Sequence, residues 1–420
     1  MPQSSILDGL ELLKKRDFVK LFAAYLITYT GTAMAPIAMA FGVLDLTGSA
    51  KDAAFVIAAP VVAQIILILV GGAVADRTSR QRMLILADLL AMCSQLTIAY
   101  CFLSGSASVP ILVGLMLISG SATALSTPAA MGFITQMVEQ DELQAANALL
   151  GVARNSALMM GAALAGILVA SFGAGITLAI DGISFGISAV LILSLKPKAQ
   201  VHPAAASLLE DMRLGWHEFI SHTWLWSIVL QFSMIVAAME AVFGLVGPAV
   251  TRAQMNGPID WGIISAGFGL GTLIGGLLAL RIEVKRPMLV ATFCTFLFCV
   301  VPLSLSVPLS VWVIASLAFV EGIAGQFFAV LWYTTLQKMV APHMLSRVSA
   351  YDHLGSMVLA PLGIIAAGFL YESMGFRTTL LIASAAIVLP SLCVLAVRDV
   401  RELTTIRVNK QHELNQELYQ

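Results

Sequence analysis

Charged side chains are scarce in this sequence of 420 residues. Asp, Glu, Lys and Arg together make up 11% of it, whereas soluble proteins carry about 25%. Hydrophobic residues make up 59%, and the mean hydropathy is +0.91. This composition excludes a soluble enzyme, a disordered chain and a nucleic-acid-binding protein with a basic face. The long unbroken apolar runs also exclude an outer-membrane barrel, so a helical membrane protein with many spans remains.

The sequence also lacks the motifs that bind nucleotides or metals. It has no P-loop, no glycine-rich dinucleotide loop after a strand and no His-Glu-x-x-His helix. We therefore expect no enzymatic activity, no catalytic residue, no cofactor and no bound metal. The five cysteines lie in apolar stretches without paired spacing, so we expect small, buried hydrophobic side chains with free thiols. They are Cys93, Cys101, Cys294, Cys299 and Cys393.

Apolar runs long enough to cross a membrane recur along the whole chain. A span needs about 20 apolar residues. Twelve candidate spans cover residues 18–44, 53–75, 83–104, 109–133, 147–171, 175–195, 223–248, 259–281, 287–306, 308–334, 345–371 and 377–397. The one long connection, 196–222, divides them six and six. We predict an N-terminal six-helix bundle over 1–195, a cytoplasmic linker over 196–222, a C-terminal six-helix bundle over 223–397 and a cytoplasmic tail over 398–420.

The basic residues predict the orientation of the spans. With the N-terminus in the cytoplasm, the outer loops hold only Lys51, Arg252 and Arg377, and Arg154 lies inside a span. The remaining nineteen of the 23 Lys and Arg residues are then cytoplasmic. Because cytoplasmic loops are enriched in Lys and Arg, we expect both termini in the cytoplasm.

The two halves repeat each other at an offset of 202 residues. Four glycines, Gly120, Gly161, Gly166 and Gly173, align with Gly322, Gly363, Gly368 and Gly375. The matched stretches are a cytoplasmic loop and the small-residue-rich helix that follows it, in spans 4–5 and 10–11. Two parallel six-span repeats around a central cavity are typical of a transporter.

The loop between spans 2 and 3 carries the most specific motif. It reads Gly71-Gly72-Ala73-Val74-Ala75-Asp76-Arg77-Thr78-Ser79-Arg80-Gln81-Arg82. This resembles the signature loop of the major facilitator superfamily, with Ser79 where the second glycine is usual. The resemblance covers nearly the whole chain. It implies an all-α membrane protein with twelve transmembrane helices in two pseudo-symmetric six-helix bundles, and an aspartate, Asp76, that engages span 11 when the carrier opens outward.

Less specific motifs suggest a branch of the family. Residues 16–18 and 46–49, Ala146-Asn147-Ala148 and Leu345-Ser346-Arg347-Val348 are similar to the bacterial enterobactin exporters and macrolide efflux pumps, and also to lysophospholipid transporters. The resemblance implies a multi-pass protein of the bacterial inner membrane. The glycine–proline antiporter motif of span 5 is incomplete, because Gly161 and Gly166 are present without the proline.

Ionisable residues inside spans are functional candidates because they are costly to bury. We expect Asp45 and Asp181 to be solvated at the outer ends of spans 1 and 6. Four other ionisable residues lie at similar depth near the cytoplasmic ends of their spans: Asp88, Arg154, Asp352 and His353. We predict that they pair across the interface between the halves or form static structural pairs. The predicted cytoplasmic gate comprises Gly72, Asp76, Arg77, Arg80, Asp88, Arg154, Asp352 and His353.

Two carboxylates lie deeper. Glu240 in span 7 and Glu321 in span 10 belong to spans that line the cavity in this fold, so they are candidates for proton coupling or substrate binding; the alternative is a polar contact between packed helices. Apolar and aromatic walls with few polar groups suit an amphiphilic ligand. The further cavity candidates are Tyr25, Tyr29, Met34, Gln231, Phe243, Gln326, Phe327 and Trp332.

These observations predict a secondary active transporter. We expect alternating-access export of a small amphiphilic molecule, such as a drug-like compound or a siderophore, across the inner membrane by proton antiport. Its partners are then the substrate, protons and the lipid bilayer, with no nucleic acid, and we expect a monomer. One alternative is an importer or flippase of a metabolite or lysolipid without proton antiport. Another is a membrane receptor or scaffold that transports nothing.

Overall fold

Helices form wherever the sequence has a long apolar run, because a backbone inside hydrocarbon must satisfy its hydrogen bonds within its own segment. The computed structural model describes residues 11–139, 142–197, 208–279, 281–282, 284–406 and 408. Within these ranges, only the backbone is described for 68–77, 144, 148, 208–212, 342, 343 and 346. Ten helices in the described part are long and apolar enough to cross a membrane. The predicted fold class is confirmed, because two of these ten contain two spans each.

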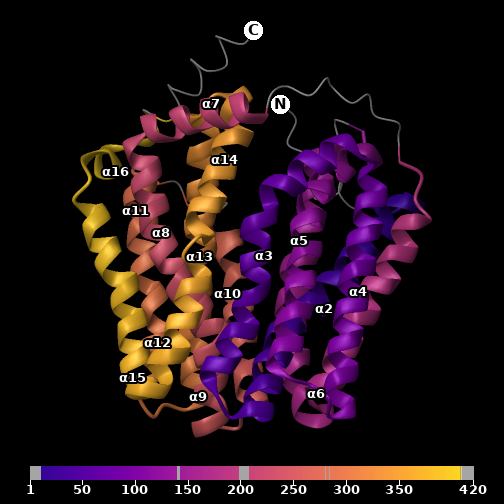
Figure 1. Ribbon diagram of the computed structural model, residues 1–420. Coiled ribbons are helices and arrows are strands. Elements are labelled where there is room, and N and C mark those ends of the chain that lie inside the picture. The colour runs from indigo at the N-terminus through magenta and orange to yellow at the C-terminus, as the bar shows by residue number, and fades with distance from the viewer. Residues whose placement is uncertain are drawn as a thin grey trace. The chain divides into compact units, whose positions relative to one another are not determined.

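The chain forms two compact units. The first comprises Met1–Ala204 and Thr251–Ala266, and the second comprises Ala205–Val250 and Gly267–Gln420. The main helices of the first unit are α2 (Arg16–Thr47), α3 (Ala50–Arg77), α4 (Arg80–Ser104), α5 (Val109–Met137) and α6 (Leu143–Leu193). The end of α9 (Gly247–Gln254) and the first part of α10 (Pro258–Ala279) also belong to it. Figure 1 shows α2 to α6 running alongside one another in this unit.

The second unit begins with a helix in the predicted linker. Residues 198–207 of that linker lie outside the described part, and α7 (Leu208–Ser221) follows. The helices after it are α8 (Thr223–Ala241), the π-helix η2 (Val242–Val246), α11 (Pro287–Thr295), the 3₁₀-helix η3 (Phe296–Cys299), α12 (Val300–Leu305), α13 (Val311–Met339), α14 (Pro342–Met357), α15 (Ala360–Leu395) and α16 (Arg398–Glu402). In Figure 1, α7 lies across the end of this bundle, beside α14. Of the predicted tail, residues 407 and 409–420 are outside the described part.

Single glycines divide the two longest helices. Gly173 in α6 has φ 80° and ψ 172°, and Gly375 in α15 has φ 79° and ψ 167°. Only glycine adopts this conformation readily. Two spans therefore meet at Gly173 within α6, and at Gly375 within α15 the span that begins in α14 meets the last span. Because the two glycines are related by the predicted offset of 202 residues, the internal repeat extends to the backbone conformation.

Other repeated glycines mark close helix crossings. A Cβ on Gly161 of α6 would lie 2.5 Å from the Thr30 carbonyl oxygen of α2, and a Cβ on Gly363 of α15 would overlap the Ala237 carbonyl oxygen of α8. Helices in a membrane approach closely where small residues remove the intervening side chains. The sequence repeat therefore corresponds to the same crossing in both units, with span 5 on span 1 and span 11 on span 7.

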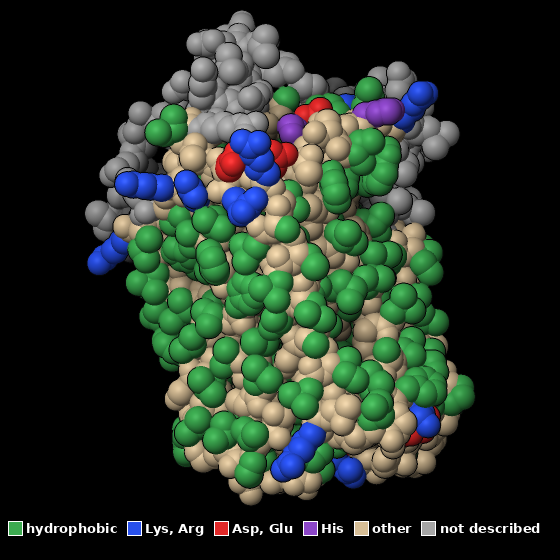
Figure 2. Space-filling view, turned by 90° about the vertical axis from the view of Figure 1, so that its left-hand side faces the viewer, with side chains coloured by type: hydrophobic (Ala, Val, Ile, Leu, Met, Phe, Trp, Pro, Cys, Tyr) green, Lys and Arg blue, Asp and Glu red, His purple; other side chains and the backbone are tan. Residues whose placement is uncertain are grey.

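The outer surface of the spans is apolar. Figure 2 shows one face, on which hydrophobic side chains form a broad band and the charged side chains gather at its two ends. Ile66, Tyr100, Val190 and Leu389 are among many large hydrophobic residues that are exposed, as expected for side chains that face lipid tails. All five cysteines are free thiols. The expectation that all five are buried is wrong for Cys93 and Cys393, which are exposed, and Cys294 is only half-buried. A thiol on the outside of a span faces hydrocarbon, which suits it as well as a protein core does.

Candidate functional site

A polar pocket lies within the first unit, between α2, α4, α5 and α6. Its volume is about 440 Å³, within the range of about 300–1,000 Å³ that is usual for small-molecule sites. We call it the polar pocket. Its polar lining residues are Tyr25, Thr28, Tyr29, Thr32, Asp88, Thr123, Ser126, Thr127, Asn147, Arg154 and Ser188. Two predicted gate residues and two predicted cavity residues are thus brought together with several hydroxyl groups.

Two tyrosines and a carboxylate give this pocket its chemistry. Tyr25 and Tyr29 lie one turn apart on α2, with ring centroids 5.7 Å apart. The Tyr25 hydroxyl and one oxygen of Asp88 are buried without a hydrogen-bond partner among the described residues. Ser188 lies beside the Asp88 carboxyl group. Buried polar atoms without partners are costly, so these two groups are available to a ligand or to water.

Arg154 also lines the polar pocket, and its side chain is exposed. Among the described residues, no ion pair within 4.0 Å joins Arg154 to a carboxylate. Asp88 and Arg154 therefore present opposite charges to one cavity without neutralising each other by contact. This arrangement can bind a ligand that carries both a cationic and an anionic or polar group.

The other predicted gate residues belong to the second unit or to the signature loop. Asp352 of α14 is buried and accepts a hydrogen bond of 3.0 Å from the Trp332 indole N–H of α13, while His353 beside it is exposed. The side chains of Gly72, Asp76 and Arg77 lie outside the described residues. The predicted pairing of these groups stays a prediction.

The described part of the signature loop holds helices together within the first unit. The Arg80 guanidinium donates a hydrogen bond of 2.7 Å to the Gly132 carbonyl oxygen of α5. The Gln81 amide donates two bonds of 2.9 Å to the carbonyl oxygens of Ile192 and Leu195 at the end of α6. The loop needs no second glycine, because Ser79 has φ −64°. Sequence reasoning missed the Gln81 contact because its partners are more than 100 residues away.

Glu321 contacts a break in the ninth span. It is fully buried on α13, and its Oε2 accepts a hydrogen bond of 3.0 Å from the Val301 backbone N–H, while its Oε1 has no partner among the described residues. Span 9 consists of α11, η3 and α12 instead of one regular helix. The sequence signal for this break is Pro302, whose ring clashes with the carbonyl group four residues earlier, that of Phe298, in an uninterrupted helix.

The remaining cavity candidates of the second unit differ in their surroundings. Gln231 is buried, and its amide donates to Thr295 at 3.0 Å and to Ser391 at 2.9 Å, which links α8, α11 and α15. Trp332 is buried against Asp352. The other four are half-buried. Glu240 lies at the end of α8, Phe243 lies in η2 with its ring 5.0 Å from that of Phe268, and Gln326 and Phe327 lie on α13.

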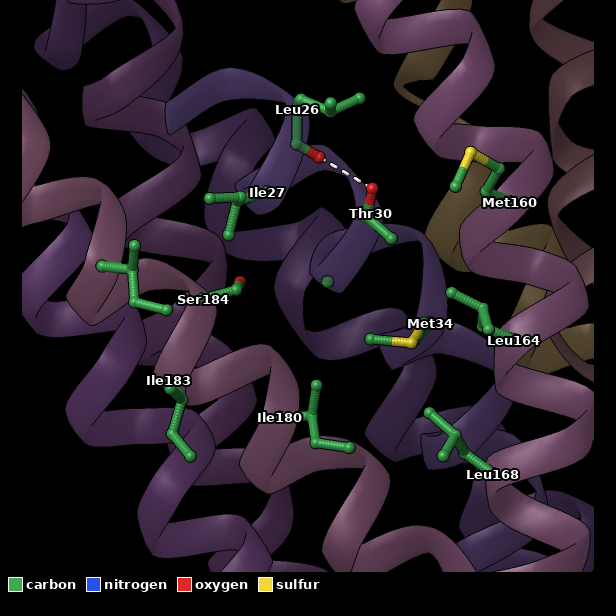
Figure 3. Close-up of a pocket in the computed structure, with 12 residues that line it drawn as sticks. Leu26, Ile27, Thr30, Met34, Met160, Leu164, Leu168, Ile180, Ile183 and Ser184 are labelled. Atoms are coloured by element: carbon green, nitrogen blue, oxygen red, sulfur yellow. Dashed lines mark hydrogen bonds between the residues drawn. The ribbon is translucent and has the colours of Figure 1, made fainter. Parts of the chain in front are cut away.

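A second, apolar pocket of about 440 Å³ lies between α2 and both parts of α6. Met34, a predicted cavity residue, lines it (Figure 3). Asp181 lies beside it and is 0% exposed, so the expectation that Asp181 is a solvated helix end is wrong; it is two turns inside the span that starts at Gly173. Asp45 does lie at a solvated end, where it pairs with Arg252 at 2.6 Å.

A comparison with protein families matches almost the whole chain to one family. The model of one family, described as transmembrane secretion effector and belonging to the MFS class, matches residues 9–419. The multidrug efflux pump Tap of Mycobacterium bovis is 27% identical over 405 residues, which cover 92% of this chain and 94% of Tap. An uncharacterised MFS-type transporter of Bacillus subtilis, YkuC, is 24% identical over 362 residues, covering 81% and 82% of the two chains.

Solved structures share the fold. The nucleoside transporter NupG superposes with a TM-score of 0.72 at 14% identity and covers 91% of this chain and 98% of NupG. A bacterial homologue of the human lysosomal transporter Spinster, in an inward-facing and unoccupied conformation, gives 0.67 at 17% identity, with 96% and 92% covered. At these identities the likeness supports the fold alone.

Proposed function

Since this chain belongs to the transmembrane secretion effector family of the major facilitator superfamily, we propose that it exports a small amphiphilic molecule across the bacterial inner membrane by alternating access and proton antiport. The chain is a multi-pass membrane transporter of a non-enzymatic superfamily. This membership favours a carrier over a receptor or scaffold. Export is proposed because the relative Tap, which resembles this chain over 92% of its length, is named as an efflux pump.

The polar pocket is the observation on which this proposal rests. Its volume suits a small molecule, and its wall combines apolar side chains with hydroxyl groups, a carboxylate and a guanidinium. Amphiphilic ligands need such a mixture, because the apolar surface supplies affinity while the few polar groups fix orientation. Asp88 and Arg154 are the groups that we propose contact the polar part of the substrate.

Glu321 is the group that we propose couples proton movement to the conformation of the second unit. An ionised carboxylate accepts a stronger hydrogen bond than its protonated form. Because Glu321 accepts from the Val301 N–H at the break in span 9, gain or loss of a proton changes how firmly that break is held. Protonation of the Glu321 carboxyl group would thereby change the conformation of span 9. Glu240 is the second candidate, because it precedes the π-helix of span 7.

We place both termini and the basic loops in the cytoplasm. Under this orientation the Asp45–Arg252 ion pair lies on the periplasmic side, and Asp88 and Arg154 lie nearer the cytoplasm. A polar pocket on the cytoplasmic side gives an exporter access to compounds inside the cell.

The test is substrate-dependent proton movement in proteoliposomes that contain the full chain and a lumenal pH dye. The added compounds are siderophores, macrolides, cationic dyes and lysolipids. We expect at least one to change the lumenal pH, and we expect the change to be lost in Glu321→Gln. The control is Glu402→Gln, which makes the same chemical change at an exposed carboxylate of α16. Flux of a compound without proton movement would contradict antiport, and loss in Glu240→Gln alone would move the coupling role to Glu240.

A further inference from the structure

We propose that the cytoplasmic end of the second unit binds the headgroup of an anionic phospholipid. Two segments form this site: the loop between α10 and α11, and α16 after the last span. Their exposed basic side chains, which we call the basic rim, are Arg281, Lys285, Arg286, Arg398 and Arg401. The inference rests on the proposed function only for the choice of the cytoplasmic leaflet. The binding surface itself is argued from the second unit alone.

The loop and the tail form one surface because they are bonded and packed together. The Thr405 backbone N–H donates a hydrogen bond of 3.0 Å to the Lys285 carbonyl oxygen, and the Thr405 hydroxyl donates to the Val284 carbonyl oxygen. Val400 of α16 and Leu403 after it are buried in the hydrophobic core of the second unit. The tail is therefore fixed beside the start of α11, and the basic side chains of both segments are held at one place.

The basic rim carries more positive charge than its acidic neighbours neutralise. Arg398 pairs with Glu402 at 2.9 Å. Among the described residues, no salt bridge within 4.0 Å joins any of the other four basic side chains to a carboxylate. Asp399, the other acidic residue of α16, is half-buried. Cations that share one exposed surface without ion-pair partners attract an anionic ligand.

The corresponding loop of the first unit uses its polar side chains differently. When Gly71-Gly72 is aligned with Gly275-Gly276, Gln81 corresponds to Lys285. Gln81 is half-buried and bonds to carbonyl oxygens at the end of α6, so it holds its loop against its own bundle. Lys285 is exposed, and Thr405 holds its loop through the backbone instead. The lysine side chain is thus not needed to hold the loop and is available to a ligand.

Exposed isoleucines within the same two segments favour a lipid over a soluble anion. Ile282 in the loop is 48% exposed, and Ile406 in the tail is 82% exposed. Large apolar side chains beside cations are typical of protein surfaces that insert into the boundary between headgroups and acyl chains. A nucleotide or free phosphate would use the cations alone. A phospholipid uses both kinds of side chain, because its phosphate pairs with the cations and its chains cover the isoleucines.

The basic rim also borders the apolar surface that faces the bilayer. Figure 2 looks at the side of the molecule on which Figure 1 places α16, and Lys and Arg side chains lie along the upper border of its hydrophobic band. Further into the spans, Phe293 of α11 and Leu392 of α15 are exposed. A lipid whose headgroup lies at the rim can therefore lay its acyl chains on these helices without leaving the bilayer.

The test compares two phospholipids with the same acyl chains: dioleoyl phosphatidylglycerol, which is anionic, and dioleoyl phosphatidylcholine, which is zwitterionic. Native mass spectrometry of the purified full chain in detergent measures the dissociation constant of each. We expect the wild-type chain to bind phosphatidylglycerol more tightly. In Lys285→Gln/Arg401→Gln, phosphatidylglycerol should bind roughly ten- to thirtyfold more weakly, since one Lys or Arg near an anionic headgroup changes the affinity about fivefold. Binding of phosphatidylcholine should not change.

Two further variants separate the contributions of charge and apolar contact. The matched control is Arg16→Gln/Arg82→Gln, which removes two exposed cations from the first unit and should leave phosphatidylglycerol binding unchanged. Ile406→Ser removes apolar contact without removing charge, so it should weaken both lipids alike. Excess inorganic phosphate should not displace phosphatidylglycerol, because it lacks the acyl chains.

Four results would overturn the proposal. Equal affinity of the wild-type chain for both lipids would mean that the rim does not recognise charge. An equal loss in Arg16→Gln/Arg82→Gln would assign the effect to the total charge of the chain. Weaker binding of both lipids in Lys285→Gln/Arg401→Gln would mean that these cations hold the fold. Displacement by inorganic phosphate, or full binding in Ile406→Ser, would assign the rim to a soluble anion. None of these results depends on proton movement in proteoliposomes, so failure of this site and failure of the proposed antiport are separate.

Discussion

Replacing Gly173 by alanine tests whether the turn between the two spans of α6 is imposed by backbone conformation alone. A Cβ at this position would meet no heavy atom within 4 Å, so the added methyl group has room. The whole cost therefore comes from φ 80° and ψ 172°, a region that residues with a side chain rarely occupy. Such a conformation costs about 1–3 kcal/mol, and we expect Gly173→Ala to lower the free energy of unfolding by that amount.

Two other glycines provide controls of opposite sign. Gly114 in α5 and Gly151 in α6 also have no heavy atom within 4 Å of an added Cβ, but both lie inside regular helix. Alanine is favoured over glycine there by about 0.5–1 kcal/mol. The same chemical change should therefore stabilise the chain at these positions and destabilise it at Gly173.

Unfolding of the purified protein by sodium dodecyl sulfate, followed by tryptophan fluorescence, measures both effects. Gly375→Ala should repeat the loss in the second unit, because Gly375 has φ 79° and an equally open surrounding. If Gly173→Ala proved as stable as Gly151→Ala, the positive φ would not be what defines this turn, and the division of α6 into two spans by one glycine would be refuted.

Two further predictions follow from contacts within single units. Gly120→Ala and Gly322→Ala should each abolish accumulation of folded protein. The new methyl groups would overlap the backbone of α3 at Pro60 and of α10 at Phe268. Normal yields on size-exclusion chromatography would show that the helices at these crossings can move apart to accommodate a methyl group. Trp332→Phe removes the donor that bonds to buried Asp352 and should cost about 1–3 kcal/mol in the same unfolding assay, while Trp312→Phe, at an exposed tryptophan of α13, should cost little.

The spans and the repeat could be predicted because their signals are local. A membrane helix is recognised from about 20 apolar residues in a row, whatever its neighbours in the fold are. The repeat is recognised from identical residues at a fixed offset. Gly173 and Gly375 are one such pair, and they also share the same backbone conformation. Spans 5 and 6 were predicted as separate apolar runs from the same signal, and the 51 residues of α6 are indeed too many for a single crossing of a bilayer.

The surroundings of single polar residues could not be predicted in the same way. A span is apolar on all sides, so its sequence gives no amphipathic stripe that tells which side faces a cavity. Asp181 illustrates the difficulty, because it is buried beside Gly31, which lies 150 residues earlier in the chain. Gln231 likewise depends on Thr295 and Ser391. Distant helices set these contacts, and only the packed structure brings them together.

The first helix shows how one apolar span can serve two chemically different pockets. Tyr25, Thr28, Tyr29 and Thr32 follow the spacing of one helical face and line the polar pocket. Leu26, Ile27, Thr30, Gly31 and Met34 interleave with them on the other face and line the apolar pocket. Thr28 and Thr30 both donate to carbonyl oxygens of their own helix, so Thr28→Val and Thr30→Val make the same change on opposite faces. If the two pockets are separate sites, Thr28→Val alters ligand binding only in the polar pocket and Thr30→Val only in the apolar pocket. Equal effects of both substitutions on both sites would instead mean that α2 moves as a whole and that the pockets act as one.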